Sequence, residues 1–154
     1  MRFKYVGGIG VPKNCRIEYD LNRKILKTIY EADNETDKSF FVCTPDLNLK
    51  LRFSMTDGVF VGLSCNCLEL DLLPRRKIEI AYAPDGEVKV DCPLKGIIVD
   101  CTYFGFVGGA CYDESKKALL FGAISENDAV YRVLDNAYLS ISFDGSLSGV
   151  FVKL

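Results

Sequence analysis

Short runs of alternating apolar and polar residues fill much of the chain. The longest alternation covers residues 47–54 (Leu-Asn-Leu-Lys-Leu-Arg-Phe-Ser), and another covers residues 77–82 (Lys-Ile-Glu-Ile-Ala-Tyr). A period of two sends successive side chains to opposite faces of a strand, so these runs predict half-buried β-strands. Similar short runs predict strands at residues 16–19, 25–30, 39–43, 59–63, 87–90, 96–100, 118–121, 138–143 and 147–152.

Sequences that favour tight turns separate many of these runs. Asp-Gly stands at residues 57–58, 85–86 and 144–145, Gly-Gly stands at 108–109, and Asp-Leu-Asn-Arg stands at 20–23. Short strands at intervals of roughly 8–12 residues are typical of sandwiches and barrels. The pattern predicts an all-β, mainly antiparallel fold, either a β-sandwich or a partly open barrel. Residues 1–154 are expected to form a single β-rich domain.

One segment, residues 126–134, has features of both a helix and a strand. Ser125 is a suitable N-cap, and Asp128 stands at the third position of the helix that would follow. Val130, Tyr131 and Val133 instead favour extended structure. Both interpretations stay open, and the chain is expected to contain at most one short helix.

The composition is that of an ordinary globular protein with almost balanced charge. The 154 residues are 49% hydrophobic, and 19 Lys and Arg against 21 Asp and Glu leave a net charge of −2. Proteins that bind nucleic acids usually carry a clear basic excess, so no nucleic-acid partner is predicted. No run approaches the ~18 apolar residues of a membrane span, and the glycine-rich N-terminal stretch does not resemble a signal peptide. A cytoplasmic protein without a membrane partner is expected.

Seven cysteines and the absence of histidine restrict the available chemistry. The odd number of cysteines and the lack of a secretory signal predict reduced thiols, at positions 15, 43, 65, 67, 92, 101 and 111. Cys65 and Cys67 lack the CxxC spacing of a zinc site, so no metal and no cofactor is predicted. Without histidine, the commonest general base, an enzyme would depend on this pair or on two carboxylates in a cleft. The chain is therefore predicted not to be an enzyme.

Four carboxylates alternate in one polar segment, at Glu31, Asp33, Glu35 and Asp37. A calcium loop also needs glycine at its sixth position and a carboxylate at its twelfth. Counted from Asp33, those positions hold lysine and threonine, which argues against calcium. One interpretation is a solvated loop between strands, and the other is an acidic contact for a basic partner. These four residues are the candidate binding site predicted from the sequence.

Several motifs follow one another along the C-terminal two-thirds of the chain. They are Asp57-Gly58 with Val61-Gly62-Leu63, residues 71–74 (Asp-Leu-Leu-Pro), Tyr112-Asp113, and a tail with Ala129-Val130, Asn136, Leu139, Asp144-Gly145, Leu147 and residues 150–152 (Val-Phe-Val). In these motifs the chain resembles small β-rich bacterial proteins of the toxin-immunity type. Such proteins often carry Trp in and before the last strand, whereas this chain has none. The resemblance implies a β-rich fold and a role as an immunity protein.

The predicted function is a non-enzymatic protein-binding domain. In its most concrete form, it is an immunity or inhibitor protein that neutralises a cognate toxin by occluding the toxin's site, with a basic toxin domain as partner. The 8 Tyr and 10 Phe residues fit this prediction, because aromatic side chains are frequent hot spots at protein interfaces. The alternative is a β-barrel-like protein that binds a small apolar ligand in its interior.

Overall fold

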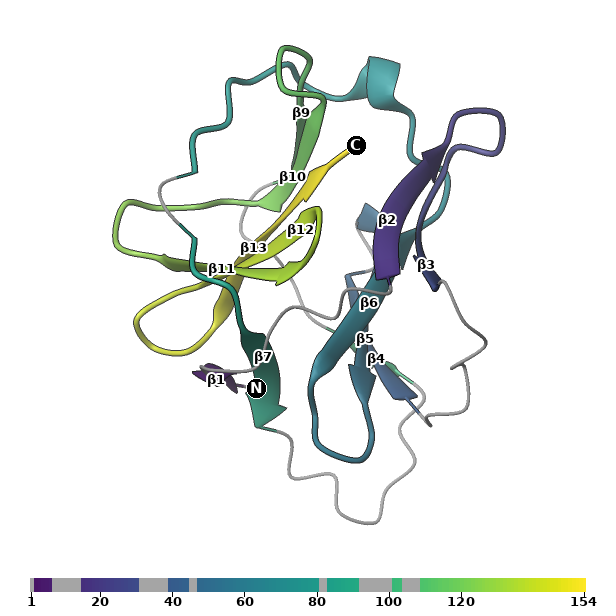
Figure 1. The fold of residues 1–154 in the computed structure, drawn as a ribbon. Coiled ribbons are helices and arrows are strands. Elements are labelled where there is room, and N and C mark those ends of the chain that lie inside the picture. Colours follow the sequence, from purple (N-terminus) through teal and green to yellow (C-terminus); the bar gives the residue numbers. More distant parts are fainter. Residues whose placement is uncertain are drawn as a thin grey trace.

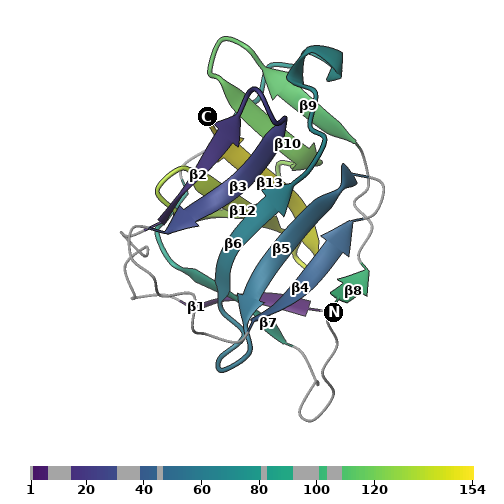
Figure 2. The same ribbon diagram turned by 90° about the vertical axis from the view of Figure 1, so that its right-hand side faces the viewer.

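Two large β-sheets lie face to face, and a two-stranded sheet lies at one end of them (Figures 1 and 2). This computed structural model describes residues 2–6, 15–30, 39–44, 47–80, 83–91, 101–103 and 109–154. The strands are β1 (Arg2–Val6), β2 (Cys15–Asp20), β3 (Ile25–Tyr30), β4 (Ser39–Thr44), β5 (Leu49–Ser54), β6 (Phe60–Cys65), β7 (Glu87–Asp91), β8 (Cys101–Tyr103), β9 (Ala110–Asp113), β10 (Ala118–Gly122), β11 (Ala129–Leu134), β12 (Ala137–Ile141) and β13 (Leu147–Lys153).

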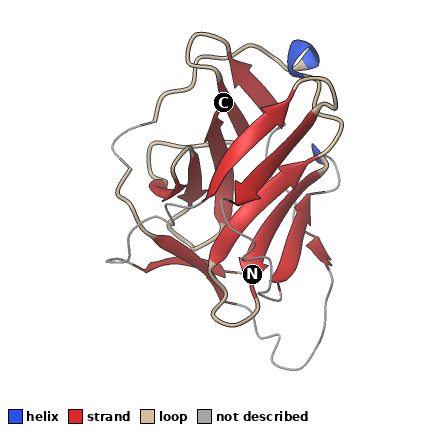
Figure 3. Ribbon diagram, turned by 45° about the vertical axis from the view of Figure 1, so that its right-hand side comes forward, coloured by secondary structure: helices blue, strands red, loops and turns tan. Residues whose placement is uncertain are grey.

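The sheet orders confirm the predicted fold class, an all-β, mainly antiparallel sandwich. The six-stranded sheet has the order β2-β3-β6-β5-β4-β8, the five-stranded sheet has the order β11-β12-β13-β10-β9, and β1 pairs with β7. Among the described strands, only β4 and β8 pair in parallel, and none of these sheets closes into a barrel. Figure 3 shows how strands dominate the fold, with the one-turn 310 helix η2 (Leu70–Leu72) in the connection after β6.

One hydrophobic core is shared by all three sheets. Phe53 and Phe60 come from the six-stranded sheet, Phe121 and Val150 come from the five-stranded sheet, and Val88 comes from β7. Each of these side chains is buried. The alternation in the sequence therefore has a direct cause, because each sheet presents one face to this core.

Strand β10 departs from alternation because it is buried on both faces. Leu119 and Phe121 point into the shared core, whereas Ala118 and Leu120 belong to a second cluster on the outer face of the sheet. Ile78 covers that second cluster. A strand covered on both sides has a continuous apolar sequence, which explains the run at residues 118–121.

The segment that covers the outer face is here named the strap, residues 74–80 and 83–86. At one end it bridges to edge strand β9, through Arg75 and Tyr112, and at the other end it bridges to edge strand β11, through Asp85 and Arg132. The strand predicted at 77–82 is therefore wrong for residues 77–80, while residues 81–82 lie outside the described part. Alternation arises there because Ile78 and Ile80 pack on the sheet, whereas Lys77 and Glu79 are exposed.

The helical interpretation of residues 126–134 is also wrong. Ser125 and Asp128 hydrogen-bond each other in a tight turn, where the Ser125 Oγ lies 2.8 Å from Asp128 Oδ1. Strand β11 starts at the next residue and pairs with β12 along its length. The β-branched and aromatic residues outweigh the capping signal because they pack on a pleated surface. The strand predicted at 96–100 lies outside the described residues.

Asn136 joins the two large sheets at the turn between β11 and β12. Its Oδ1 accepts a hydrogen bond from the Ile17 backbone N–H at 2.9 Å. Its Nδ2 donates to the Ile17 carbonyl at 2.7 Å and to the Lys153 carbonyl at 2.7 Å. Ile17 lies in β2, an edge strand of the six-stranded sheet, so one side chain satisfies backbone groups that a neighbouring strand would otherwise pair.

The cysteines correct one sequence-based expectation. Cys43 is disulfide-bonded, so the prediction that all seven cysteines are reduced is wrong. Burial raises the pKa of the Cys15, Cys65 and Cys111 thiols, in the case of Cys65 to about 12. These three therefore stay protonated and poorly nucleophilic near neutral pH. Across the described part of the chain, no helix has the length and apolar character needed to cross a membrane.

Candidate functional site

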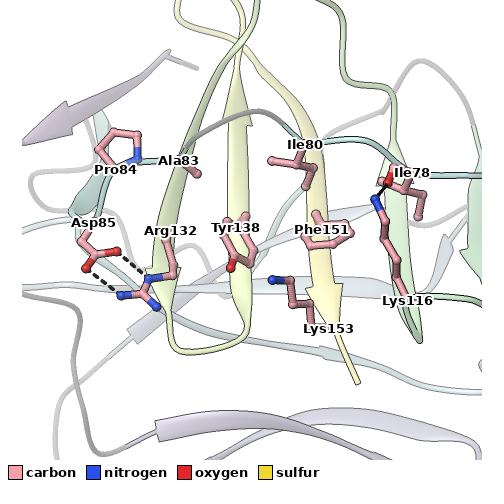
Figure 4. Close-up of a pocket in the computed structure, with 10 residues that line it drawn as sticks. All are labelled: Ile78, Ile80, Ala83, Pro84, Asp85, Lys116, Arg132, Tyr138, Phe151 and Lys153. Atoms are coloured by element: carbon pink, nitrogen blue, oxygen red, sulfur yellow. Dashed lines mark hydrogen bonds and ion pairs between the residues drawn. The ribbon is translucent and has the colours of Figure 1, made fainter.

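A groove of about 750 Å³ lies between the strap and the outer face of the five-stranded sheet (Figure 4). Its walls come from the strap, from the turn before β10, and from strands β11, β12 and β13. Pockets of ~300–1,000 Å³ are typical binding sites, which makes this groove the candidate site. The lining residues are Ile78, Ile80, Ala83, Pro84, Asp85, Lys116, Arg132, Tyr138, Phe151 and Lys153.

The floor of the groove is a row of side chains across three neighbouring strands. The strand register places Arg132 opposite Tyr138, and Tyr138 opposite Phe151. The rings of Tyr138 and Phe151 meet edge to face, with centroids 5.3 Å apart and planes at 64°. Residues paired across strands share a sheet face, so the pairing of the strands holds this row in place, with two aromatic rings next to Arg132.

Asp113 holds the strap at the β9 end. Its Oδ2 accepts a hydrogen bond from the Ile78 backbone N–H at 2.9 Å, and its Oδ1 accepts from Ser115 Oγ at 2.6 Å. Only 4% of Asp113 is exposed. The bond from the Ile78 N–H, followed by that from Ser115, lowers the pKa of this carboxyl to about 2. A carboxylate with these donors stays ionised at neutral pH and anchors the strap.

Arg132 holds the strap at the β11 end. Its Nε and Nη2 bind the two carboxylate oxygens of Asp85, at 2.5 and 2.7 Å (Figure 4). The hydrogen bond from Arg132 lowers the pKa of Asp85. The backbone takes part as well, because Arg132 N–H donates to the Pro84 carbonyl and Gly86 N–H donates to the Arg132 carbonyl. The strap thereby covers the outer edge of β11, which would otherwise be open to another strand.

Two lysines supply positive charge at the groove without a direct ion pair, although Lys116 lies close enough to Glu79 to help lower the pKa of that carboxyl. Lys116 Nζ donates to the Ile78 carbonyl at 2.6 Å, and Lys153 Nζ lies 5.4 Å from the ring centroid of Tyr138. Neither forms an ion pair with a residue that the structure describes. Three cations and one carboxylate line the groove, so its net charge is +2, whereas the whole chain carries −2.

We expect Asp113→Asn to loosen the strap. An amide group has only one acceptor oxygen, and its NH2 group would point toward one of the groups that now donate a hydrogen bond to Asp113. Exchange of the Ile78 amide hydrogen should become faster, on the order of tenfold, because one charge-assisted hydrogen bond is lost. Hydrogen exchange followed by mass spectrometry or NMR measures this, with Asp144→Asn as the matched control. Asp144 makes a similar turn with Ser146 and does not touch the strap.

The same pair of variants tests the pH dependence of stability. A carboxyl whose pKa is lowered in the folded state stabilises the fold above its ordinary pKa of about 4 and loses that effect as pH falls through the folded value. For Asp113 that value is about 2. The stability difference between wild type and Asp113→Asn should therefore shrink as pH falls from about 5 toward 2. A difference that stays constant over this interval would contradict the assignment.

The groove differs from every site that the sequence suggested. The acidic residues Glu31, Asp33, Glu35 and Asp37 lie outside the described residues. Cys65 and Cys67 do not form a reactive pair at a cleft, because the first is buried while the second is exposed. Among the described residues, no group of three or more metal-ligating side chains could hold an ion. Two features of the sequence indicate the groove in retrospect. One is the continuous apolar run at 118–121, which is buried on both faces of its sheet, and the other is the pair of apolar residues at 78 and 80.

Comparison with known proteins assigns no family to the chain. No protein-family model matches it, and a search of curated proteins finds no match. The toxin-immunity resemblance therefore stays a prediction. The motifs that carry it are largely structural: Asp57-Gly58 forms the turn between β5 and β6, and Asp144-Gly145 forms the turn between β12 and β13. Motifs of this kind relate folds more directly than activities.

Proposed function

We propose that this chain is a non-enzymatic protein-binding domain that holds an exposed segment of its partner in the strap groove. The observation that carries the proposal is the row of side chains beneath the strap, formed by Arg132 and the two aromatic residues Tyr138 and Phe151. Tyr and Arg are enriched among the residues that dominate binding at protein interfaces. Their cross-strand pairing holds them in position before a partner arrives, which lowers the entropic cost of binding.

The dimensions of the groove suit a short extended segment. The lining residues run from β11 through β12 and β13 to the turn before β10. Neighbouring strands lie about 4.8 Å apart, so three steps span about 14 Å. An extended chain rises about 3.3 Å per residue, so roughly four or five residues of a partner would fill that length.

Within this proposal, the specific role is that of an immunity or inhibitor protein that occludes the site of a cognate toxin. The motif resemblance supports this role. A protein that acts by occlusion needs a preformed contact surface and no reactive groups of its own. The acidic segment with Glu31, Asp33, Glu35 and Asp37 is proposed as a separate contact for a basic region of the same toxin.

Site-specific photo-crosslinking in the source cells tests the proposal. The residue p-benzoylphenylalanine is placed at Ala83 in the groove wall and, as a control, at Lys27, an exposed position on β3 of the other sheet. We expect one defined protein adduct from position 83 and none of that mass from position 27. Absence of a protein adduct at position 83, or equal yields at both positions, would contradict the proposal.

A growth assay tests the toxin-specific part. The captured partner, expressed without this chain, should stop growth, and co-expression of the chain should restore growth. Tyr138→Ala should weaken that protection, because it removes the ring that packs on Phe151 in the groove floor. If the captured partner is harmless when expressed by itself, the immunity role is wrong while the binding role still holds.

The groove also favours the second candidate function, binding of a small apolar ligand. Its volume of about 750 Å³ lies within the usual range for small-molecule sites, and the partly buried Ile80 and Tyr138 supply apolar surface. The interior between the sheets is occupied by core side chains such as Phe53 and Phe60, so a ligand would sit in the groove instead. Native mass spectrometry of the purified protein would reveal such a ligand as added mass that Tyr138→Ala diminishes.

A cytoplasmic location is part of the proposed role, and the Cys43 disulfide is the observation that opposes it. Disulfides persist mainly in oxidising compartments and are rare in the cytosol. Rapid alkylation of intact cells followed by mass spectrometry separates the two cases. A cytoplasmic protein should be alkylated at Cys43, whereas a protein of an oxidising compartment should leave that position protected until a reductant is added.

A further inference from the structure

The charges around the strap groove indicate the chemistry of the segment that it binds. In Figure 4, Lys153 lies below the rings of Tyr138 and Phe151, whereas Lys116 lies at the far end of the row, beside Ile78. The charge of Arg132 is already paired with that of Asp85, through two hydrogen bonds. The positive charge of the groove that is not held in a direct ion pair therefore belongs to the two lysines, whose ammonium groups keep unused donors; of the two, Lys116 also feels the carboxylate of Glu79.

We propose that the groove selects an acidic segment of a protein partner, one that places Asp or Glu beside aromatic or aliphatic side chains. This inference rests on the proposed function. An apolar side chain of the segment would lie on Tyr138, whose ring packs against the buried Phe151, and neighbouring carboxylates would reach Lys116 and Lys153. Ion pairs that form beside an apolar floor are less screened by solvent than exposed pairs, so they contribute to selectivity.

The other anionic partners fit the charges less well. A nucleic acid or an anionic membrane presents many charges and would approach the whole surface of a chain whose net charge is −2. Close to the groove, Lys77 is already paired with Glu79 at 2.6 Å, so this ion pair adds no net charge to the region. The positive charge is thus local, confined to a site that four or five residues would fill, which favours a short acidic segment.

Peptide selection on the full chain tests the inference. A phage-displayed library of random twelve-residue peptides is selected against the immobilised protein, and the recovered peptides are measured by fluorescence anisotropy. We expect the enriched peptides to combine acidic and apolar residues. Their affinity should fall about fivefold with Lys116→Gln, about fivefold with Lys153→Gln and roughly 25-fold with both, as expected for independent charge pairs.

Two controls make the result specific. Lys50→Gln, on β5 of the other sheet, should change affinity by less than about twofold, because that lysine lies far from the groove. Lys153→Glu should lose the acidic peptide and gain binding to a version in which one acidic residue is replaced by lysine. A merely structural role for Lys153 would not reverse the preference in this way, and unfolding midpoints confirm that each variant is folded.

The outcomes separate this inference from the proposed function. If peptides bind and Tyr138→Ala abolishes the binding, but replacing their acidic residues with Asn or Gln has no effect, the charge inference is wrong and the groove function stands. If the enriched peptides are basic, the inference is wrong as well. If no recovered peptide depends on Tyr138, the groove does not hold a peptide, and the proposed function itself fails.

Discussion

Phe53→Ala should destabilise the fold by about 4 kcal/mol, the largest effect that we expect from a single truncation. The Phe53 ring is 0% exposed and contacts three other rings, those of Phe3, Phe40 and Phe60, with centroids 5.6 to 5.8 Å away. Phe3 lies in β1, so this ring cluster joins the small sheet to the six-stranded sheet. Its removal would leave a cavity at the place where those sheets meet.

Urea denaturation followed by circular dichroism measures this loss. Thermal denaturation followed by the same signal should show the unfolding midpoint fall by about 10 °C, at 2–4 °C per kcal/mol for a chain of this size. Phe143→Ala is the matched control, because it removes the same side chain at a position that is 95% exposed, in the turn between β12 and β13. The control should change stability by no more than about 0.5 kcal/mol. Similar losses in both variants would argue against the shared core.

Asn136→Asp should cost about 2–3 kcal/mol although the side chain hardly changes in size. The Asn136 amide donates to the carbonyls of Ile17 and Lys153 and accepts from the Ile17 N–H. A carboxylate cannot donate, so the oxygen that replaces Nδ2 would face two carbonyl oxygens at hydrogen-bond distance. The repulsion acts between the sheets and should separate edge strand β2 from the turn before β12.

Hydrogen exchange identifies where that loss occurs. Amides of β2 should exchange faster in Asn136→Asp, while those of β5, in the middle of the same sheet, should respond only to the global loss of stability. Asn66→Asp is the control, since Asn66 is exposed and its side chain makes no hydrogen bond that the structure records. Lowering the pH until the new carboxyl is protonated should restore part of the stability, because a protonated carboxyl can donate once.

Several elements were predictable from local pattern because their environment repeats along the chain. The bounds of β3 agree with the predicted strand at 25–30, and β10 and β13 differ from their predictions by one residue. Each has an apolar run next to a turn signal, and such a run is stabilised in a sheet wherever it occurs, because its apolar side chains pack in the core. Strands β1, β8 and β9 were not among the predicted runs: β8 and β9 have only three and four residues, and β1 lies beside glycine-rich sequence.

The strap shows why the candidate site was not predictable in the same way. Residues 77–80 alternate like a strand, yet their backbone pairs with no neighbouring strand. The strap meets the edge strands β9 and β11 only at its two ends, through Arg75 and Asp85. Alternation indicates that one side of a segment faces an apolar surface. It does not indicate whether the backbone of that segment pairs with a neighbouring strand. The groove follows from this difference.

The sequence by itself determined the all-β class, most of the strand positions and the turns at Asp57-Gly58 and Asp144-Gly145, since these depend on periodicity and on local backbone preference. Only the tertiary structure decided that Arg132, Tyr138 and Phe151 form one row and that Lys116 and Lys153 stand beside it. These residues come from segments up to 37 positions apart, and their meeting depends on sheet order and on the path of the strap. Local pattern carries no information about strand order, so a site built across strands becomes visible only when the sheets assemble.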